Sequence, residues 1–137
     1  MLNYELLRPA VQQSDLSTIA QYMLMLMLRN MSSEGWVFTD PSDPSRFSKP
    51  GCIIASPSYP SDLSPVTQNY VWNWTRDAAL AAAEIARAPL PGPGSLDDYV
   101  TFASICQENA PGLDTACYTI DGQPREGCLG WGHWTIM

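Results

Sequence analysis

Three aromatic residues and an adjacent Arg-Asp pair lie close together between residues 70 and 77. Tyr70, Trp72 and Trp74 come first, and Arg76 and Asp77 follow at the point where an Ala-rich stretch begins. An aromatic ring can receive the apolar CH face of a pyranose, whose hydroxyl edge needs oriented donors and acceptors. Arg76 supplies a rigid fork of donors, and Asp77 supplies acceptors only. These residue types in this order favour a sugar-binding site.

The same residues also have a purely structural interpretation, in which Arg76 and Asp77 form an ion pair at a helix start and the tryptophans are core. The longer sequence context favours the sugar site. Residues 54–58 read Ile-Ala-Ser-Pro-Ser, and residues 70–80 read Tyr-x-Trp-x-Trp-Thr-Arg-Asp-Ala-Ala-Leu. This pair of motifs resembles the N-terminal signature of the glucoamylases, family 15 of the glycoside hydrolases.

The resemblance implies a fold as well as a function. Glucoamylases are all-α, with an (α/α)6 toroid. The 137 residues of this chain leave room for about three to four helices plus long loops, since helices average about 11 to 12 residues. We therefore expect an incomplete part of the toroid. Residues 1–137 would be the N-terminal fragment of a glucoamylase-like catalytic domain, in truncated form.

By the same resemblance, the activity would be that of a glucan 1,4-α-glucosidase, an inverting exo-hydrolase that releases glucose from starch or maltooligosaccharides. The substrate-binding residues would be Tyr70, Trp74, Arg76, Asp77 and Trp131. Arg76 and Asp77 would hold the terminal glucose at the non-reducing end. Tyr70 and Trp74 would form a wall beside that glucose, and Trp131 would cover the next sugar.

The end of the sequence departs from the family pattern. In glucoamylases a Trp-Gly pair opens a Trp-Gly-Arg-Pro-Gln motif, and the two catalytic Glu residues follow later. Here Trp131 and Gly132 are followed by His-Trp-Thr-Ile-Met, and neither Glu has a counterpart. We therefore expect no catalytic residue in this chain and no hydrolysis by this chain alone.

Composition narrows the choice of ligand and location. The net charge of −7, with Lys49 as the one lysine, disfavours nucleic acid and anionic lipid as partners. The four cysteines and the single His133 lack zinc-site spacing, so we expect neither a metal nor another cofactor. One disulfide and four buried thiols both remain open. The acidic composition is typical of secreted hydrolases, so we expect an extracellular or secretory-pathway protein, although no signal peptide is recognisable.

The spacing of apolar residues and the residues typical of helix starts and ends predict three helices. Apolar residues recur at helical spacing from Leu16 to Arg29, Ala and Leu fill residues 78–87, and Ser95 starts a third helix to about Gln107. Residues 30–51 are rich in Pro, Ser and Asp and predict a surface loop, followed by an extended segment at residues 52–55. Asn30 and Asn73 each begin a glycosylation sequon, and we expect Asn73 to stay unmodified because a glycan would obstruct the sugar site.

Two alternatives to the hydrolase remain. A non-catalytic regulatory or carbohydrate-binding protein on a glucoamylase-like toroid is one, since the regulatory subunits of phosphorylase kinase are similar around a Trp-x-Arg-Asp segment. A small secreted module held by disulfides is the other. If the chain is an incomplete toroid, apolar helix faces at residues 16–28 and 78–85 lack cover, and we expect self-association through them.

Overall fold

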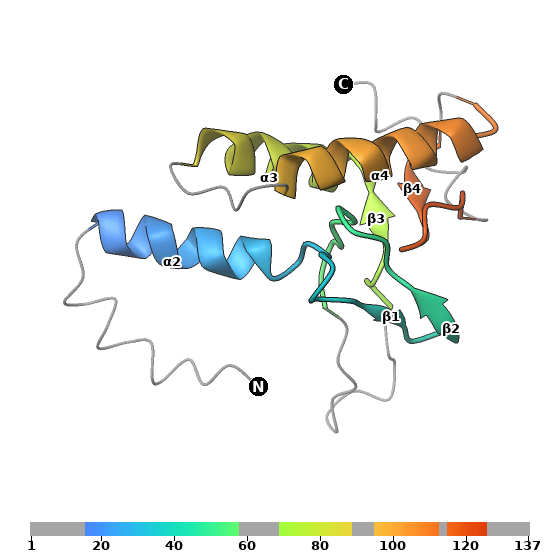
Figure 1. Ribbon diagram of the computed structural model, residues 1–137, viewed down its shortest axis with the longest axis horizontal. Coiled ribbons are helices and arrows are strands. Elements are labelled where there is room, and N and C mark those ends of the chain that lie inside the picture. Colours follow the sequence, from blue (N-terminus) through green and yellow to red (C-terminus); the bar gives the residue numbers. More distant parts are fainter. Residues whose placement is uncertain (1–15, 58–68, 89–94, 113–114, 126–137) are drawn as a thin grey trace.

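The computed structural model describes residues 16–57, 69–88, 95–112 and 115–125. This part of the chain forms three helices and two small antiparallel sheets of two strands each (Figure 1). The elements in chain order are α2 (Leu16–Leu28), β1 (Thr39–Asp40), β2 (Asp43–Phe47), β3 (Asn73–Trp74), α3 (Thr75–Arg87), α4 (Ser95–Asn109) and β4 (Cys117–Tyr118). The prediction of an all-α fold is therefore wrong. The part of the chain that the structure describes is helical with two short sheets.

The first sheet lies in the stretch that we expected to be a loop. β1 and β2 pair antiparallel, with Thr39 opposite Phe47 and Asp40 opposite Asp43. The turn between them is closed by the Asp40 carboxylate, whose Oδ1 accepts the backbone N–H of Ser42 at 2.9 Å. Such a side-chain turn explains why a stretch rich in Pro, Ser and Asp still folds back on itself.

The second sheet joins two segments that are far apart in sequence. β3 pairs antiparallel with β4, so that Asn73 lies opposite Tyr118 and Trp74 opposite Cys117. Both strands are two residues long, which is too short for the alternating pattern that identifies a strand in a sequence. Figure 1 shows this pair beside the helices, with β3 leading directly into α3.

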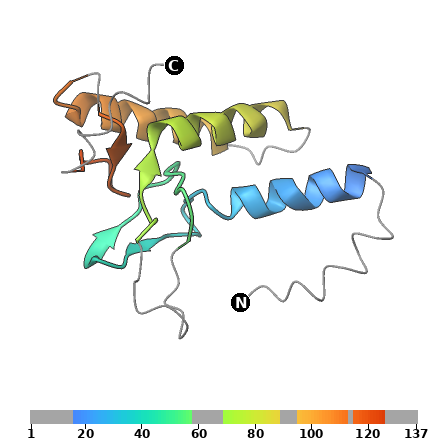
Figure 2. The same cartoon turned by 180° about the vertical axis from the view of Figure 1, so that it is seen from behind.

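Helices α3 and α4 run side by side in both views (Figures 1 and 2). α3 begins at Thr75, earlier than the predicted Ala78, because β3 delivers the chain directly into the first turn. Its buried residues Ala78, Ala82 and Ile85 recur at helical spacing. Small alanine side chains let a neighbouring helix approach closely. Ala78, Ala82 and Ile85 are thus covered by other parts of the chain, whereas Leu80 is exposed. Self-association through the helix faces stays a prediction.

Two hydrophobic clusters form the core. One surrounds the thiols of Cys52 and Cys106 and contains the buried residues Cys52, Ile54, Val71, Phe102, Cys106, Tyr118 and Ile120. The other joins α3 to the end of α2 through Met31, Ile53, Ala78, Ala82 and Ile85. The extended segment predicted at residues 52–55 thus contributes to both clusters.

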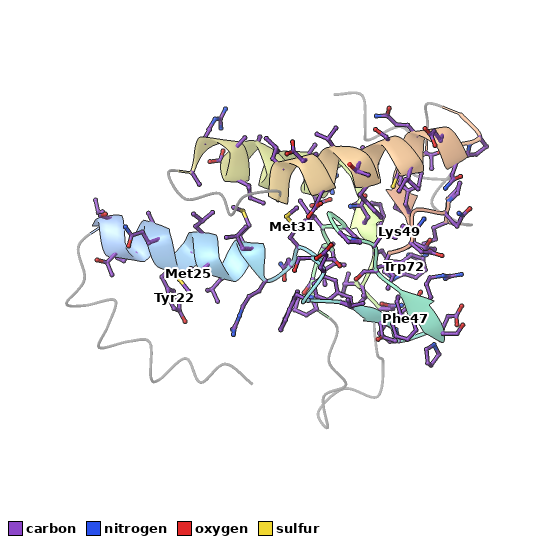
Figure 3. The ribbon with its side chains drawn as sticks, in the orientation of Figure 1. Tyr22, Met25, Met31, Phe47, Lys49 and Trp72 are labelled. Atoms are coloured by element: carbon purple, nitrogen blue, oxygen red, sulfur yellow. The ribbon has the colours of Figure 1, made fainter. Side chains whose placement is uncertain are left out.

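Helix α2 differs from the other two helices because it contains no buried residue. Met27 and Leu28 are half-buried against the second cluster, but Leu16 is 84% exposed and Met25 is 64% exposed. Tyr22 projects from α2 on the side away from α3 and α4 (Figure 3). Among the described helices, none is long and apolar enough to cross a membrane.

Loop 48–52 touches α4 at a glycine. Gly51 has a φ of +83°, and a Cβ placed on it would lie 2.0 Å from the backbone oxygen of Asp98. Only a residue without a side chain fits there. The following Cys52 is buried and free, as is Cys106, whereas Cys117 is disulfide-bonded. Of the two states left open for the cysteines, four buried thiols is therefore the wrong one.

Candidate functional site

The segment from Asn69 to Asp77 carries most of the predicted site and is held by backbone hydrogen bonds on both sides. Ala55 donates its N–H to the Trp72 carbonyl at 3.0 Å. From the other side, Thr75 donates its N–H to the Ala116 carbonyl at 3.1 Å, next to the β3–β4 pairing. The aromatic segment is therefore part of the fixed framework of the fold, and its side chains have defined directions.

Those side chains divide between solvent and core. Tyr70 is 46% exposed, whereas Trp72 is only 9% exposed. Trp74 is half-buried, and the residues between, Val71 and Asn73, are buried. In an extended segment Tyr70, Trp72 and Trp74 would all point to the same side, because alternate residues share a face. The structure places Trp72 on the buried side, so the exposed aromatic surface here comes from Tyr70 and part of Trp74.

Arg76 and Asp77 form an ion pair at the start of α3. Arg76 Nη2 lies 3.1 Å from Asp77 Oδ2, and both side chains are open to solvent, at 60% and 44% exposure. Asp77 is the acidic residue of the first helical turn, and Trp74 at the N-cap position offers no side-chain cap. The carboxylate therefore lies near unpaired backbone N–H groups and the positive end of the helix dipole. The donors of Arg76 and the acceptors of Asp77 therefore lie next to each other at the protein surface.

The pair does not belong to the larger of the two described cavities. That cavity, of about 510 Å³, lies between α3, α4 and β4, and its lining includes Asn73, Thr75, Tyr99 and Gln107 but neither Arg76 nor Asp77. The remaining predicted contact, Trp131, lies outside the described residues. The structure thus brings Tyr70, Trp74, Arg76 and Asp77 onto one short segment, and the described residues leave the ion pair open rather than enclosed.

Trp72 has a partner that the sequence analysis missed. The guanidinium carbon of Arg125 lies 2.9 Å from the centre of the Trp72 ring system, a cation–π contact. Burial lowers the pKa of Arg125. Within the described part of the chain the buried Trp72 Nε1 has no hydrogen-bond acceptor. No sequence signal connects two residues this far apart, because they meet only through the β3–β4 pairing.

A buried carboxylate close to the aromatic segment was also missed. Asp40 is 1% exposed, and its Oδ1 accepts hydrogen bonds from Ser42 Oγ at 2.6 Å and from Asn69 Nδ2 at 2.8 Å. Burial alone would raise the pKa of Asp40, but the hydrogen bonds from Ser42, Asn69 and Arg46 outweigh it and hold the pKa below its ordinary value. Asp40 is thus an ionised group in the interior.

Arg46 balances this charge and connects the hairpin to the segment after β4. Its guanidinium lies 3.3 Å from Asp40 Oδ2, 3.6 Å from Asp43 Oδ2 and 3.4 Å from Asp121 Oδ1. The pKa of Asp43 is lowered, chiefly by hydrogen bonds from Ser45. The Arg46 guanidinium therefore lies among the carboxylates of Asp40, Asp43 and Asp121. Among the described residues no group of three or more His, Cys, Asp or Glu is arranged to hold a metal ion.

The sequon at Asn73 lies in the core. Asn73 is buried, and its Nδ2 donates a hydrogen bond to the Ile53 carbonyl at 2.9 Å. That nitrogen is the atom that would carry a glycan. The structure therefore gives a second physical reason to expect no modification at Asn73, besides obstruction of a sugar site.

Comparison with known proteins adds one match. A family model described as glycosyl hydrolases family 15 matches residues 25–127. The matched region begins inside α2 and contains all of the other described helices and strands, including the whole segment from Asn69 to Asp77. No curated protein matches the chain, and no solved structure matches it.

Proposed function

Because the chain belongs to glycosyl hydrolases family 15, whose model covers most of it, we propose a role in glucoamylase-type hydrolysis. In that reaction α-glucosidic bonds of starch or maltooligosaccharides are cleaved from the non-reducing end with inversion, and glucose is released. The residues that we assign to substrate binding are Tyr70, Trp74, Arg76, Asp77 and Trp131.

The observation that carries this proposal is the solvent-open ion pair on a fixed backbone. Arg76 and Asp77 are adjacent, paired at 3.1 Å and more than 40% exposed each, directly after a strand that is hydrogen-bonded within a sheet. A purely structural ion pair gains little at such exposure. A ligand that removes water from it gains charge-assisted hydrogen bonds, which are stronger than neutral ones.

The chemistry of a terminal glucose fits these groups. Neighbouring hydroxyls each donate and accept, so one hydroxyl can donate to Asp77 while the next accepts from Arg76. The apolar face of the sugar ring would lie against the exposed parts of Tyr70 and Trp74. A neutral ligand also suits a chain whose net charge is −7, since it meets no charge repulsion.

Bond cleavage needs groups of a different kind. Inversion uses a carboxylic acid and a carboxylate roughly 6.5 to 9.5 Å apart, and the acid must be protonated near neutral pH. The clustered carboxyls Asp40 and Asp43 have lowered pKa values, which makes them poor proton donors. Glu84 is bonded to Arg87 at 2.6 Å on the far part of α3. We therefore assign substrate binding, and not the acid–base pair, to the described residues.

The binding role is tested by titrating the chain with maltotriose and following tryptophan fluorescence or amide NMR shifts. Arg76→Ala and Asp77→Asn should each weaken binding about tenfold or more, since each loses a charged hydrogen bond worth about 1.5 to 3 kcal/mol. The matched control is Arg87→Ala, which breaks an exposed Arg–Glu pair on the same helix. Equal weakening in the control, or no weakening in either test variant, contradicts the assignment.

The assignment of the acid–base pair is tested separately by activity. Incubation of the 137-residue chain with maltooligosaccharides should release no glucose above the Arg76→Ala background. Robust release that disappears in Arg76→Ala would show that this chain carries its own catalytic acids.

A further inference from the structure

We propose that Asp40, acting through Asn69, positions Tyr70 at the sugar site. Asp40 would not touch the substrate, so its role is that of a positioning residue. The inference rests on the proposed function to the extent that Tyr70 contacts the sugar. Its geometric part, the tether between the hairpin and the aromatic segment, stands on the hydrogen bonds alone.

Asp40 can hold neighbouring groups in place because its carboxylate is buried and hydrogen-bonded. Its carboxylate is 1% exposed and receives hydrogen bonds from the Ser42 N–H, the Ser42 hydroxyl, the Asn69 amide and the Arg46 guanidinium. Because every one of these groups is a donor, the site requires a side chain that only accepts. A carboxylate satisfies that requirement, and an amide at position 40 would turn a donor toward at least one of them.

The Asn69 side chain links the Asp40 carboxylate to the backbone around Tyr70. Its Nδ2 donates to Asp40 Oδ1 at 2.8 Å and to Ser42 Oγ at 2.9 Å. Its Oδ1 accepts the backbone N–H of Val71 at 2.9 Å. The side chain of Asn69 thus bonds to the residue after Tyr70 while its own backbone precedes Tyr70, so Tyr70 lies at the tip of a short closed turn.

The turn presents an exposed ring on a restrained backbone. The Tyr70 carbonyl accepts the Trp72 N–H at 2.9 Å, which tightens the same turn, and the Tyr70 residue remains 46% exposed. An aromatic ring that stacks on a sugar contributes most when it is already held in the bound geometry, because binding then loses less conformational freedom. Breaking the tether should therefore weaken sugar binding without removing any sugar-contacting atom.

The test variants act on Asn69 and keep Tyr70 intact. Asn69→Ala removes the hydrogen bonds of the side chain to Asp40 and Ser42 and the acceptor of the Val71 N–H. It should lower maltotriose affinity about tenfold, the scale of lost preorganisation for one side chain and its turn. Asn69→Asp keeps the acceptor for the Val71 N–H but faces the Asp40 carboxylate with a second negative charge, so at pH 7 it should weaken binding to a similar extent.

The pH profile separates positioning from a general loss of structure. In Asn69→Asp one proton bound between the two carboxyls restores a donor toward Asp40, and like charges raise the pKa of one member of such a pair. Affinity of Asn69→Asp relative to wild type should therefore recover as pH falls from 7 to about 4.5, while Asn69→Ala should show no recovery. The charged groups around Asp40 in the structure, Arg46, Asp43, Asp121 and Arg125, are unchanged in both variants.

Two controls keep the outcomes distinct. Ser45→Ala removes a hydrogen bond to Asp43 in the same hairpin and should leave affinity unchanged. Tyr70→Ala should weaken binding, and if it does not, the proposed sugar contact of Tyr70 fails. If Tyr70→Ala weakens binding and Asn69→Ala does not, the positioning role of Asp40 and Asn69 is overturned.

Amide hydrogen exchange tests the tether without any sugar. The Val71 N–H loses its acceptor in Asn69→Ala and should exchange about tenfold faster or more, whereas the Ile54 N–H, bonded to the Asn30 carbonyl, should be unaffected. Unchanged exchange at Val71 would show that Asn69 does not hold this turn, whatever the sugar experiments give.

Discussion

Two Arg–Asp pairs near the aromatic segment have similar separations and very different surroundings. Arg46 and Asp40 are 3.3 Å apart, and Arg76 and Asp77 are 3.1 Å apart. The Asp40 side chain is 1% exposed and the Asp77 side chain is 44% exposed. The first pair lies on the buried side of the segment, and the second lies on its open side.

The difference shows that burial, and not distance, decides what such a pair can do. The Asp40 carboxylate is closed to solvent and accepts hydrogen bonds from Ser42, Asn69 and Arg46, so it connects parts of the fold and is not available to a ligand. The exposed Arg76 and Asp77 side chains are hydrogen-bonded to each other, and an exposed ion pair contributes little to stability. Its groups are available to a substrate. The predictions below test whether the two sides differ as much as the structure indicates.

The largest expected effect concerns the thiols on the buried side. Burial raises the pKa of Cys106 to about 12 and also raises the pKa of Cys52. At neutral pH the thiolate of Cys106 is then about a thousandfold rarer than that of a free cysteine. A thiol reagent should react with the native chain correspondingly slowly. In urea without reductant Cys52 and Cys106 should react quickly, whereas Cys117, which is disulfide-bonded, should react only after reduction.

Fast labelling of Cys52 or Cys106 in the native chain would show that the core around these residues opens readily. The core around these thiols would then be as accessible to a reagent as the surface that carries Arg76 and Asp77.

The next effect is the loss of the buried charge. Asp40→Ala should lower the free energy of unfolding by about 3 kcal/mol, because it leaves Arg46 and the donors of Ser42 and Asn69 without their acceptor. Urea unfolding measures it. The control is Asp43→Ala in the same hairpin, which should change stability little. Equal losses in the two variants would remove the distinction between the buried carboxylate and its exposed neighbour.

A smaller effect is expected from acid. The pKa of Asp40 is lower in the folded chain than in the unfolded chain, so its ionisation contributes stability above its unfolded value of about 3.9, and this contribution is lost as pH falls through the folded value. Unfolding free energy should therefore decline more steeply below about pH 4 in wild type than in Asp40→Ala. Parallel pH profiles would show that other carboxyls account for the acid sensitivity.

The smallest effect belongs to the open side. Arg76→Ala should change the free energy of unfolding by no more than about 0.5 kcal/mol, since exposed ion pairs contribute little. The same variant should weaken maltotriose binding strongly, as argued above. A loss of stability close to that of Asp40→Ala would instead assign Arg76 a structural role.

The sequence predicted the helices better than the rest of the fold. Helical spacing placed α2 and α4 at Leu16 and Ser95, where they begin, because amphipathic periodicity and capping are local signals. β3 and β4 are two residues each and are defined by pairing across a long stretch of chain. The sequence of the hairpin at residues 39–47 predicts a loop because Pro41 and Pro44 are typical of loops, and its turn depends on one Asp side chain.

The candidate site was predictable only where it is continuous in sequence. The sequence neighbours of Arg76 and Asp77 single them out as candidates, and their role in sugar binding stays a prediction. The ion pair between them at the start of α3 is also what the purely structural interpretation predicts. Asp40 and Arg125 approach the aromatic segment only after the chain has folded, and neither stands in a motif. The direction of Trp72 depended on the same tertiary contacts. The sequence therefore suggests candidate residues within one continuous segment, but not the tertiary contacts that hold this segment.

Gly51 has a consequence for any attempt to evolve this chain. The Asp98 carbonyl of α4 occupies the space that a Cβ at position 51 would fill, so α4 can approach this loop so closely only because residue 51 has no side chain. In a library that samples all amino acids at position 51, we expect the folded clones to carry glycine alone, and any exception to carry a helix that has moved outward by the width of a methyl group.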